Sequence, residues 1–258
     1  MKIRYLSDIH LEHLEFPPSE LPSIGEDLVV LAGDIHVGLW GVKWAMDAIK
    51  DRPVVYVFGN HECYQYTFPS LIDQAKVFAA GSNVHVLEMD SFDVCGVRVL
   101  GCSYWTDFAA LGQERVGESL HLAQKLMNDY RLIVIPDENN ILRLLVPDDT
   151  RSYNQVCHRW LQSSISSSDR PVLVVTHHAP TLATRNPHFL DDTEPSNSAF
   201  HNHHDHLIKA PVVAWIHGHH HWTVEKMVNG IPVVSNQPGY PGEYVPNFSW
   251  EKALDVAV

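Results

Sequence analysis

The stretch LVVLAGDIHVGLWGVKWAMDAIKDRPVVYVFGNHE, residues 28–62, decides the fold class of this chain. It contains two short apolar runs, 28–32 and 54–58, which are rich in β-branched residues and typical of strands buried on both faces. Between the runs, apolar side chains recur at helical spacing: Val42, Ala45, Met46 and Ile49. Pro53 then ends the helical segment. A strand, a helix and a second strand in this order predict a parallel pair joined by a crossover.

The rest of the chain continues this alternation of strands and helices. Further buried strands are predicted at residues 3–6, 172–175 and 212–216, and helices at 69–80, about 115–130 and 151–168. Antiparallel hairpin strands are predicted over residues 84–102 and in the tail 223–236, where Asn229-Gly230 makes the turn. Together these elements place the chain in the α/β class.

Length and composition favour one globular unit. A chain of 258 residues with 45% hydrophobic and 19% charged side chains has a substantial core, and α/β folds of this length are routinely single domains. We therefore expect one domain over residues 1–258. Residues 181–210 are polar and contain prolines, and we expect them to form a lid insertion over another part of the molecule.

Composition also argues against several classes of protein. The formal charge of −13 without a Lys or Arg cluster disfavours a large nucleic-acid interface, because phosphate contacts need basic side chains. The four cysteines form no C-x-x-C pair, which disfavours a zinc ribbon or a redox site and favours reduced, mostly buried thiols. No apolar run reaches membrane-spanning length and the N-terminus has no signal-peptide pattern, so we expect a cytoplasmic protein without a membrane partner.

Each predicted buried strand ends at a polar group. The residues that follow the five strands are, in order, Asp8-Ile9-His10, Asp34, Asn60-His61-Glu62, His177-His178, and the histidines of WIHGHHHW at 215–222. In open α/β sheets, ligands bind at the carboxyl ends of the strands. A single Asp-x-His or Asn-His-Glu is usually a loop, a turn or a helix cap. Five coinciding strand ends instead indicate one site, since otherwise several polar groups would be crowded together without partners.

These residues resemble the signature of the calcineurin-like metallophosphoesterase superfamily. The matching segments, in the family's order, are Asp8-x-His10, Gly33-Asp34, Gly59-Asn60-His61-Glu62, His177 and Gly218-His219-x-His221. The spacing also agrees, with 26 residues from Asp8 to Asp34 and another 26 from Asp34 to Asn60. The resemblance implies two packed, mixed β-sheets flanked by helices, and a dinuclear metal centre.

The resemblance also implies a role for each matching residue. One ion would be held by Asp8, His10, Asp34 and His221, and the other by Asp34, Asn60, His177 and His219, with Asp34 bridging. A nitrogen and oxygen donor set without thiolate suits Mn, Fe, Zn, Co or Ni as divalent or trivalent ions. Two such ions lower the pKa of bound water and clamp phosphoryl oxygens, so we expect in-line attack by a metal-bridging hydroxide on a phosphate mono- or diester. His61 would be the general acid or electrostatic stabiliser of the leaving oxygen.

Several other histidines keep more than one interpretation. His217 either orients a metal ligand or is merely packed, and His178 either contacts substrate or is packed. We expect His220 to point away from the metals, and His36 to match the DIH pattern by coincidence. The histidines of the insertion either reach phosphate or a third ion or are solvated lid residues, and we expect the second: His201, His203, His204 and His206.

Two positions depart from the family pattern or go beyond it. Some members carry an Asp or a Tyr three residues after the bridging Asp, where this chain has Val37, so a carboxylate partner for His61, if the chain has one, must come from elsewhere. Tyr240, between a glycine and a proline, either stacks on a base or aromatic leaving group or is an ordinary turn residue.

The leading functional interpretation is a dimetal hydrolase of phosphate mono- or diesters that acts on a small molecule or nucleotide. A protein Ser/Thr phosphatase is the alternative within the superfamily, and the negative charge disfavours a nuclease. A scaffold with this fold but no activity is the alternative from another class. Such proteins tend to lose metal ligands, whereas all seven ligand positions and His61 are filled here. The pattern predicts no oligomeric state.

Overall fold

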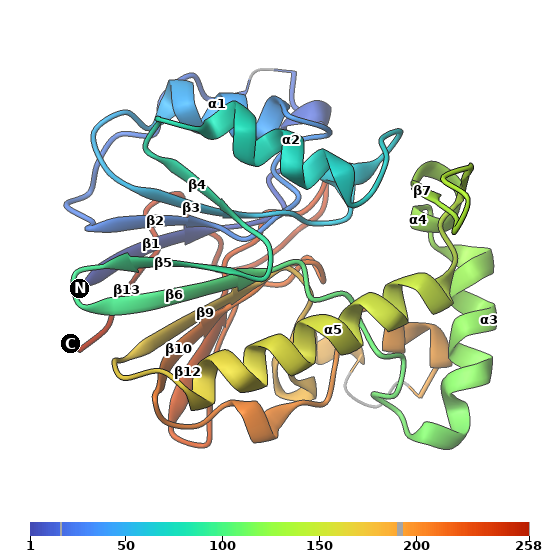
Figure 1. Ribbon diagram of the computed structural model, residues 1–258. Coiled ribbons are helices and arrows are strands. Elements are labelled where there is room, and N and C mark those ends of the chain that lie inside the picture. The colour runs from blue at the N-terminus through green and yellow to red at the C-terminus, as the bar shows by residue number, and fades with distance from the viewer. Residues whose placement is uncertain (16, 190–192, 258) are drawn as a thin grey trace.

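Two β-sheets form the centre of the computed structural model, which describes residues 1–15, 17–189 and 193–257 (Figure 1). The first sheet has the strand order β13 (Ala253–Asp255), β1 (Lys2–Leu6), β2 (Leu28–Leu31), β3 (Val54–Val57) and β4 (Val84–Leu87). Strands β1 to β4 are parallel, and β13 pairs antiparallel with β1. The strand–helix–strand unit predicted over residues 28–62 is therefore confirmed, with α1 (Trp40–Ala48) as its crossover.

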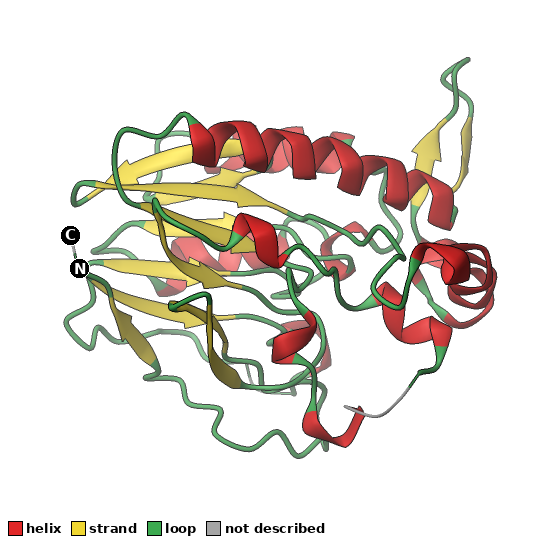
Figure 2. Ribbon diagram, turned by 90° about the horizontal axis from the view of Figure 1, so that it is seen from below, coloured by secondary structure: helices red, strands yellow, loops and turns green. Residues whose placement is uncertain are grey.

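The second sheet combines a parallel centre with antiparallel edges. Its strand order is β11 (Val224–Val228), β12 (Ile231–Ser235), β10 (Val212–Ile216), β9 (Val172–Thr176), β6 (Val97–Cys102) and β5 (Asp90–Val94). The hairpin predicted in the tail is confirmed, and β11 and β12 turn at Asn229-Gly230, both of which have positive φ. A separate small hairpin, β7 (Val134–Pro136) with β8 (Leu142–Leu144), projects beside one end of α5 (Figure 2).

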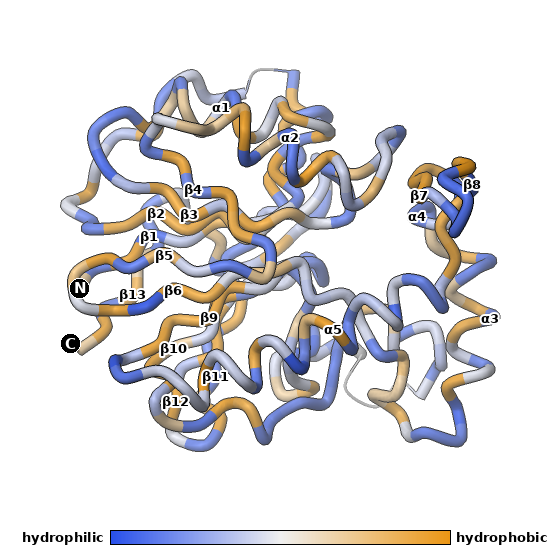
Figure 3. Tube along the Cα trace, in the orientation of Figure 1, coloured by the Kyte–Doolittle hydropathy of each residue, from blue (hydrophilic) through white to orange (hydrophobic). Residues whose placement is uncertain are grey.

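The two sheets pack face to face, and helices cover their outer faces. Alternate residues such as Val30 of β2 and Val175 of β9 point into the core between the sheets. Their neighbours Leu31 and Val174 point outward, under α1 and α2 (Ser70–Ala79) or under α5 (Pro147–Ser166). Burial on both faces explains why these strands read as continuous apolar runs (Figure 3). Two packed mixed sheets flanked by helices are the architecture that the resemblance implies, and this expectation is confirmed.

Residues 84–102 correct one prediction. Only β5 and β6 form the expected antiparallel hairpin, turning at Cys95 and Gly96 with φ of 48° and 80°. Strand β4 instead pairs parallel with β3, because α2 carries the chain back across the first sheet as a second crossover. An alternation of apolar side chains identifies a strand but does not determine its pairing direction.

Two helices differ from their predicted bounds. The helix expected over about 115–130 is α3 (Val116–Leu126) followed by the single turn α4 (Asp129–Leu132), because Met127 is extended with ψ of 135°. Helix α5 begins at Pro147 rather than at residue 151. Proline suits the first turn since it lacks the N–H that would be unpaired there, and Asp149 accepts a hydrogen bond from the backbone of Val146.

A buried polar side chain ties the insertion to the segments that follow β6 and β9. Asn202 donates to the carbonyl oxygens of Trp105 and Ala179 and accepts from the backbone N–H of Asp107. This tether buries His201 and His204, so the expectation that all four insertion histidines are solvated is wrong for these two. The other two, His203 and His206, are exposed as expected.

The described residues bear on two expectations from composition. All four cysteines are free, and only Cys95 is exposed. None of the helices in residues 1–15, 17–189 and 193–257 combines the length and the apolar character needed to cross a bilayer.

Candidate metal centre

Five strand ends converge on one site. The loops after β1, β2, β3, β9 and β10 carry the predicted ligands and His61, and in both sheets these strands run in parallel toward the same edge. The site therefore lies where the carboxyl ends of the two sheets meet. All eight side chains are buried except that of His221, which is partly exposed: Asp8, His10, Asp34, Asn60, His61, His177, His219 and His221.

The ligand atoms gather in two neighbouring clusters. Asp8, His10 and His221 form one group, and Asp34, His177 and His219 form another, with the candidate ligand atoms of each group within 4.8 Å of one another. Asp34 also groups with His10 and His61, so its carboxylate lies between the clusters. Asn60 Oδ1 lies 3.1 Å from His177 Nε2, in the second cluster. This distribution matches the two ligand sets implied by the resemblance, and the assignment of ions to them stays a prediction.

The loops that present these ligands are strained. Five of the seven predicted ligands have φ between 46° and 78°, the left-handed region that non-glycine residues rarely adopt: Asp8, His10, Asp34, His219 and His221. Such strain is typical of functional sites, where the surrounding structure compensates for it. Neighbouring glycines make the sharp turns possible. A Cβ atom at Gly33 would lie 2.5 Å from His177 Nδ1, and one at Gly218 would lie 2.5 Å from Asp8 Oδ2.

Two ligand histidines are held by their outer ring nitrogens. His10 Nδ1 lies 3.2 Å from Glu12 Oε1, and His221 Nδ1 lies 2.7 Å from Glu243 Oε2. A carboxylate accepts hydrogen bonds only, so each Nδ1 carries the proton and each Nε2 of the neutral ring has a lone pair. The two Nε2 atoms are 3.1 Å apart. Two facing lone pairs need a cation or a proton between them, and the donor set therefore fits a bound metal.

The second cluster has the same design. His177 Nδ1 donates to the carbonyl oxygen of Ala32 at 2.8 Å, so its Nε2 faces Asp34 Oδ2 at 3.4 Å and Asn60 Oδ1. Asn60 Nδ2 donates to Asp129 at 2.8 Å, which turns the amide oxygen toward the site. His219 Nε2 is buried and has no hydrogen-bond partner among the described residues. In the described part of the chain, His217 and His220 also have an unpartnered buried Nε2, so what distinguishes His219 is that its ligand atom groups with those of Asp34 and His177.

Charge coupling in the metal-free site is strong. Burial by itself would raise the pKa of Asp34, but His177 and His61 lower that pKa well below its usual range. Burial would lower the pKa of His177, but the carboxylate of Asp34 raises it to about 10. Without metal, His177 thus holds a proton on Nε2, the atom that is predicted to bind the ion. The site requires positive charge, which either a proton or a metal ion supplies.

His61 belongs to a chain of hydrogen bonds above the clusters. Its Nδ1 lies 3.2 Å from Glu12 Oε1, its Nε2 lies 2.9 Å from the Tyr240 hydroxyl, and its backbone N–H donates to Asp34. Burial lowers the pKa of His61, but Asp34 and Glu12 outweigh burial and raise it to about 9. Burial raises the pKa of Glu12, but hydrogen bonds from His10 and His61 lower it to about 2. Glu12 is thus a carboxylate partner of His61 that comes from outside the position of Val37.

Four residues at the site were not identified from the sequence: Glu12, Asp129, Tyr240 and Glu243. Glu12 follows His10 by two residues, and this proximity was its only signal. Tyr240 was noted but not assigned, and Glu243 lies three residues beyond it in the same glycine- and proline-rich loop. Asp129 had no signal, because it reaches Asn60 from a helix 69 positions further along the chain.

The remaining histidines lie around the centre without joining either cluster. His217 Nδ1 lies 3.2 Å from the Gly218 carbonyl oxygen and its ring packs against His220, which favours the packed interpretation. His178 packs with its ring centroid 4.0 Å from that of His219, and its Nδ1 lies 3.3 Å from the Ser103 carbonyl oxygen, which also favours packing. His220 stacks on His201 and lines a cavity, so it lies outside both ligand clusters but still borders the site.

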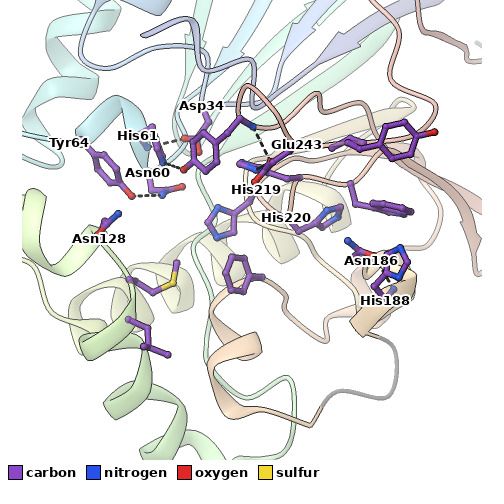
Figure 4. A pocket seen from close by; sticks show the side chains of 18 of the residues that line it. Asp34, Asn60, His61, Tyr64, Asn128, Asn186, His188, His219, His220 and Glu243 are labelled. Atoms are coloured by element: carbon purple, nitrogen blue, oxygen red, sulfur yellow. Dashed lines mark hydrogen bonds and ion pairs between the residues drawn. The ribbon is translucent and has the colours of Figure 1, made fainter. Parts of the chain in front are cut away.

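Two cavities open at the centre. The first, of about 670 Å³, is lined by Asp34, Asn60, His61, His219 and His221, among others (Figure 4). The second, of about 780 Å³, is lined by Glu12 and Val37, among others. His61 and Tyr240 line both cavities, so this pair forms part of the wall between them.

Glu62 connects the loops that carry Asp34 and His61. Its Oε2 accepts from the backbone N–H groups of Asp34 and Gly59 at 2.9 and 2.8 Å. Its Oε1 accepts from the backbone N–H of Ile35 at 2.8 Å and from the Tyr56 hydroxyl at 2.7 Å. The side chain is fully buried, and these four donors satisfy both carboxylate oxygens.

Comparison with known proteins identifies a family. A sequence model of the family described as calcineurin-like phosphoesterase matches residues 1–223. The "uncharacterized protein L509" of Acanthamoeba polyphaga mimivirus is 27% identical over 271 residues, covering 93% of this chain and 92% of the relative. The acyl-carrier-protein phosphodiesterase PptH of Mycobacterium tuberculosis is 23% identical over 274 residues, covering 93% of this chain and 78% of the relative.

Two solved structures share the fold. The phosphopantetheinyl hydrolase PptH of Mycobacterium tuberculosis superposes with a TM-score of 0.69 at 18% identity, covering 93% of this chain and 90% of that one. The protein TT1561 of Thermus thermophilus superposes with a TM-score of 0.50 at 15% identity, covering 93% and 89%. At these identities the two structures support the fold alone.

Substitution of Glu62 by Gln tests the connection between the two loops. One acceptor oxygen becomes an NH₂ group that faces other donors, so we expect a loss of about 1–3 kcal/mol of stability. Thermal unfolding of the metal-free protein measures the loss, and metal analysis is expected to show reduced binding. Glu138→Gln, at an exposed position in the β7–β8 turn, is the matched control. Unchanged unfolding and metal content in Glu62→Gln would contradict this role.

Metal affinity is expected to rise with pH. Because the pKa of His177 is about 10 in the metal-free protein, an ion must displace its proton, and lower pH favours the proton. We expect the apparent Mn affinity to increase by up to about tenfold per pH unit between about pH 6 and 9. Calorimetry in two buffers of different ionisation enthalpy measures both affinity and proton release. His177→Asn should bind more weakly with a shallower pH dependence, and a pH-independent wild-type affinity would refute the coupling.

Proposed function

This chain belongs to the calcineurin-like phosphoesterase family and is a metal-dependent phosphoesterase, and on that premise we propose that it cleaves phosphate esters at a centre of two metal ions. The observation that carries the proposal is the convergence of two ligand clusters around Asp34. Because that carboxylate lies within reach of both clusters, it is the group able to bridge two ions. We further propose that residues 1–258 act as one cytoplasmic unit.

The donor atoms support two transition-metal sites. Nitrogen and oxygen donors without thiolate suit Mn, Fe, Zn, Co or Ni. The first ion would be held by Asp8, His10, Asp34 and His221, and the second by Asp34, Asn60, His177 and His219. When bound, the two ions lower the pKa of water and neutralise the charge of phosphoryl oxygens. Glu12, Glu243 and the carbonyl oxygen of Ala32 orient three of the four ligand imidazoles for this purpose.

His61 provides a proton on the leaving-group side. Its Nδ1 is held by Glu12, so its Nε2 is the atom directed at the space above the clusters. His61 belongs to neither of the two predicted ligand sets but lines both cavities, where a substrate would contact it. Its role would be to protonate or stabilise the oxygen that leaves phosphorus.

The same observations favour a hydrolase over a scaffold, since a scaffold would have no use for the ordered chain of Glu12, His61 and Tyr240. A cavity of about 670 Å³ suits a small molecule or one arm of a larger ester. Residues of the insertion line this cavity at Asn186, His188 and Phe200, which supports a role of the insertion as a lid that selects the substrate. A protein Ser/Thr phosphatase remains the alternative within the family.

Hydrolysis of p-nitrophenyl phosphate and bis-p-nitrophenyl phosphate with added Mn tests the proposed function. We expect wild type to cleave at least one ester, and Asp34→Asn to lose activity and metal because the bridging charge is removed. Asp73→Asn, at an exposed position on α2, should behave as wild type. If metal-loaded wild type cleaves neither these esters nor a panel of natural phosphoesters, the proposed hydrolase function is wrong.

Substitution of His61 by Ala separates proton delivery from metal binding. The variant should keep both ions and lose about 10²–10⁴-fold in kcat on phenyl phosphate or diphenyl phosphate, whose leaving group needs a proton. Metal analysis and kcat are the two measurements. His121→Ala, an exposed histidine on α3, is the control. Loss of metal, or a decrease in kcat smaller than about tenfold, would rule out this assignment.

A further inference from the structure

The loop formed by residues 237–246 enters the metal centre from outside the part of the chain that matches the family, which ends at residue 223. Tyr240 is the residue of this loop that reaches deepest. Its hydroxyl lies 2.9 Å from His61 Nε2, and its ring centroid lies 4.4 Å from that of His10 and 4.6 Å from that of His221. The tyrosine therefore lies directly over two predicted ligands of the first ion.

The position of Tyr240 is specified by the loop itself. Glu243 Oε2 accepts from the backbone N–H of Tyr240 at 2.9 Å and from His221 Nδ1 at 2.7 Å. A single carboxylate oxygen thus joins the loop to a predicted metal ligand. Gly239 has φ of 72°, and a Cβ atom there would collide with the carboxylate of Glu243. The chain makes this turn only with glycine at that position.

The Tyr240 hydroxyl is hydrogen-bonded to His61 Nε2, which is the atom that a general acid would use to donate its proton. A leaving oxygen therefore has two options. It either displaces the tyrosine hydroxyl from His61 Nε2, or it forms its hydrogen bond with the tyrosine hydroxyl instead. The ordered chain runs from Glu12 Oε1 through His61 Nδ1 and Nε2 to the Tyr240 oxygen, with steps of 3.2 and 2.9 Å. Tyr240 lines both cavities, so a substrate in either cavity would meet this residue at the end of the chain.

The donors that the cavities offer to the oxygens of a substrate are histidines and neutral side chains such as Asn128 and Asn186. Neither cavity is lined by a lysine or an arginine among the described residues. The Tyr64 hydroxyl, which also lines both, already donates to Asp129 at 2.8 Å. An ester oxygen beyond the predicted metal positions therefore meets histidine, amide or hydroxyl donors, and the Tyr240 hydroxyl, at the end of the hydrogen-bonded chain through His61, is placed to be one of them.

We propose that Tyr240 is a catalytic residue that donates its hydroxyl proton to the leaving oxygen while His61 replaces that proton. An oxygen from water bonds to phosphorus as the bond between phosphorus and the leaving oxygen breaks, and the leaving oxygen departs as an alcohol or phenol with the proton of Tyr240. The tyrosine oxygen takes the proton from His61 Nε2. His61 becomes neutral and keeps the proton on Nδ1 that is directed at Glu12. This proposal rests on the proposed function and adds the residue that contacts the leaving group.

Tyr240→Phe removes the hydroxyl and keeps the ring, and Tyr244→Phe, whose side chain is 87% exposed in the same loop, is the matched control. The two variants are compared on esters of one type with different leaving groups. With a phenyl or alkyl leaving group, Tyr240→Phe should lose about 10²–10⁴-fold in kcat. With p-nitrophenol, which leaves without a proton, the loss should stay below about threefold. Equal losses on both esters would indicate a merely structural tyrosine and overturn the proposal.

A binding measurement distinguishes a Tyr240 hydroxyl that donates a hydrogen bond to the substrate from a Tyr240 side chain that the substrate has to displace. Inorganic phosphate is titrated calorimetrically into the Mn-loaded wild type and Tyr240→Phe proteins. If the hydroxyl contacts a phosphoryl oxygen, the variant should bind phosphate about threefold to tenfold more weakly, as expected for one lost hydrogen bond. If substrate has to displace the tyrosine, the variant should bind phosphate more tightly, and this result or unchanged binding would overturn the proposal. Wild type that cleaves no ester disproves the proposed function itself, before any variant is compared.

Discussion

The rest of the centre depends on the hydrogen bonds that the carboxylate of Glu62 accepts. This carboxylate is fully buried, yet three backbone N–H groups and the Tyr56 hydroxyl satisfy both of its oxygens. The backbone groups belong to the loops after β2 and β3, so one side chain holds both loops at a single spacing. The backbone of Asp34 is held by Glu62 in this way, and the Asp34 side chain accepts a hydrogen bond from the backbone N–H of His61. A charge without these donors would cost several kcal/mol in this environment.

Three of the four predicted ligand histidines share a second constraint, which is that the outer nitrogen of each ring is held by an acceptor. The acceptors are Glu12 for His10, Glu243 for His221 and a backbone carbonyl oxygen for His177. Because these Nδ1 atoms carry protons, the Nε2 atoms point inward as lone pairs toward one another or toward oxygens. Such a site is unfavourable when empty of positive charge. This arrangement of nitrogen and oxygen atoms favours the binding of a cation. The raised pKa of His177 has the same cause, because a proton is the cation that binds when no metal ion is present.

The predicted ligands and the groups that surround them come from different parts of the chain. The predicted ligands follow buried strands, whose positions are set by packing on both faces of two sheets. The groups that surround them come from less regular segments: Glu12 from the loop after β1, Asp129 from the short α4, and Tyr240 with Glu243 from the C-terminal loop. Rigid strands suit ions that need defined donor positions, whereas loops are free to shape the space above the ions. The insertion adds a third contribution by lining one cavity.

Local patterns in the sequence predicted the α/β class and the polar residues that follow each buried strand, because each strand end is a run of apolar residues followed by polar ones. The resemblance selected His219 and His221 from a run of four histidines, which strand periodicity could not do. Only the tertiary structure decided that β4 pairs parallel with β3, that His201 and His204 are buried, and that Glu12 serves both His10 and His61. It also decided that Asp129 and Tyr240 reach the centre. These contacts join segments up to 179 positions apart, and no local pattern encodes a partner that only the packing of two sheets brings near.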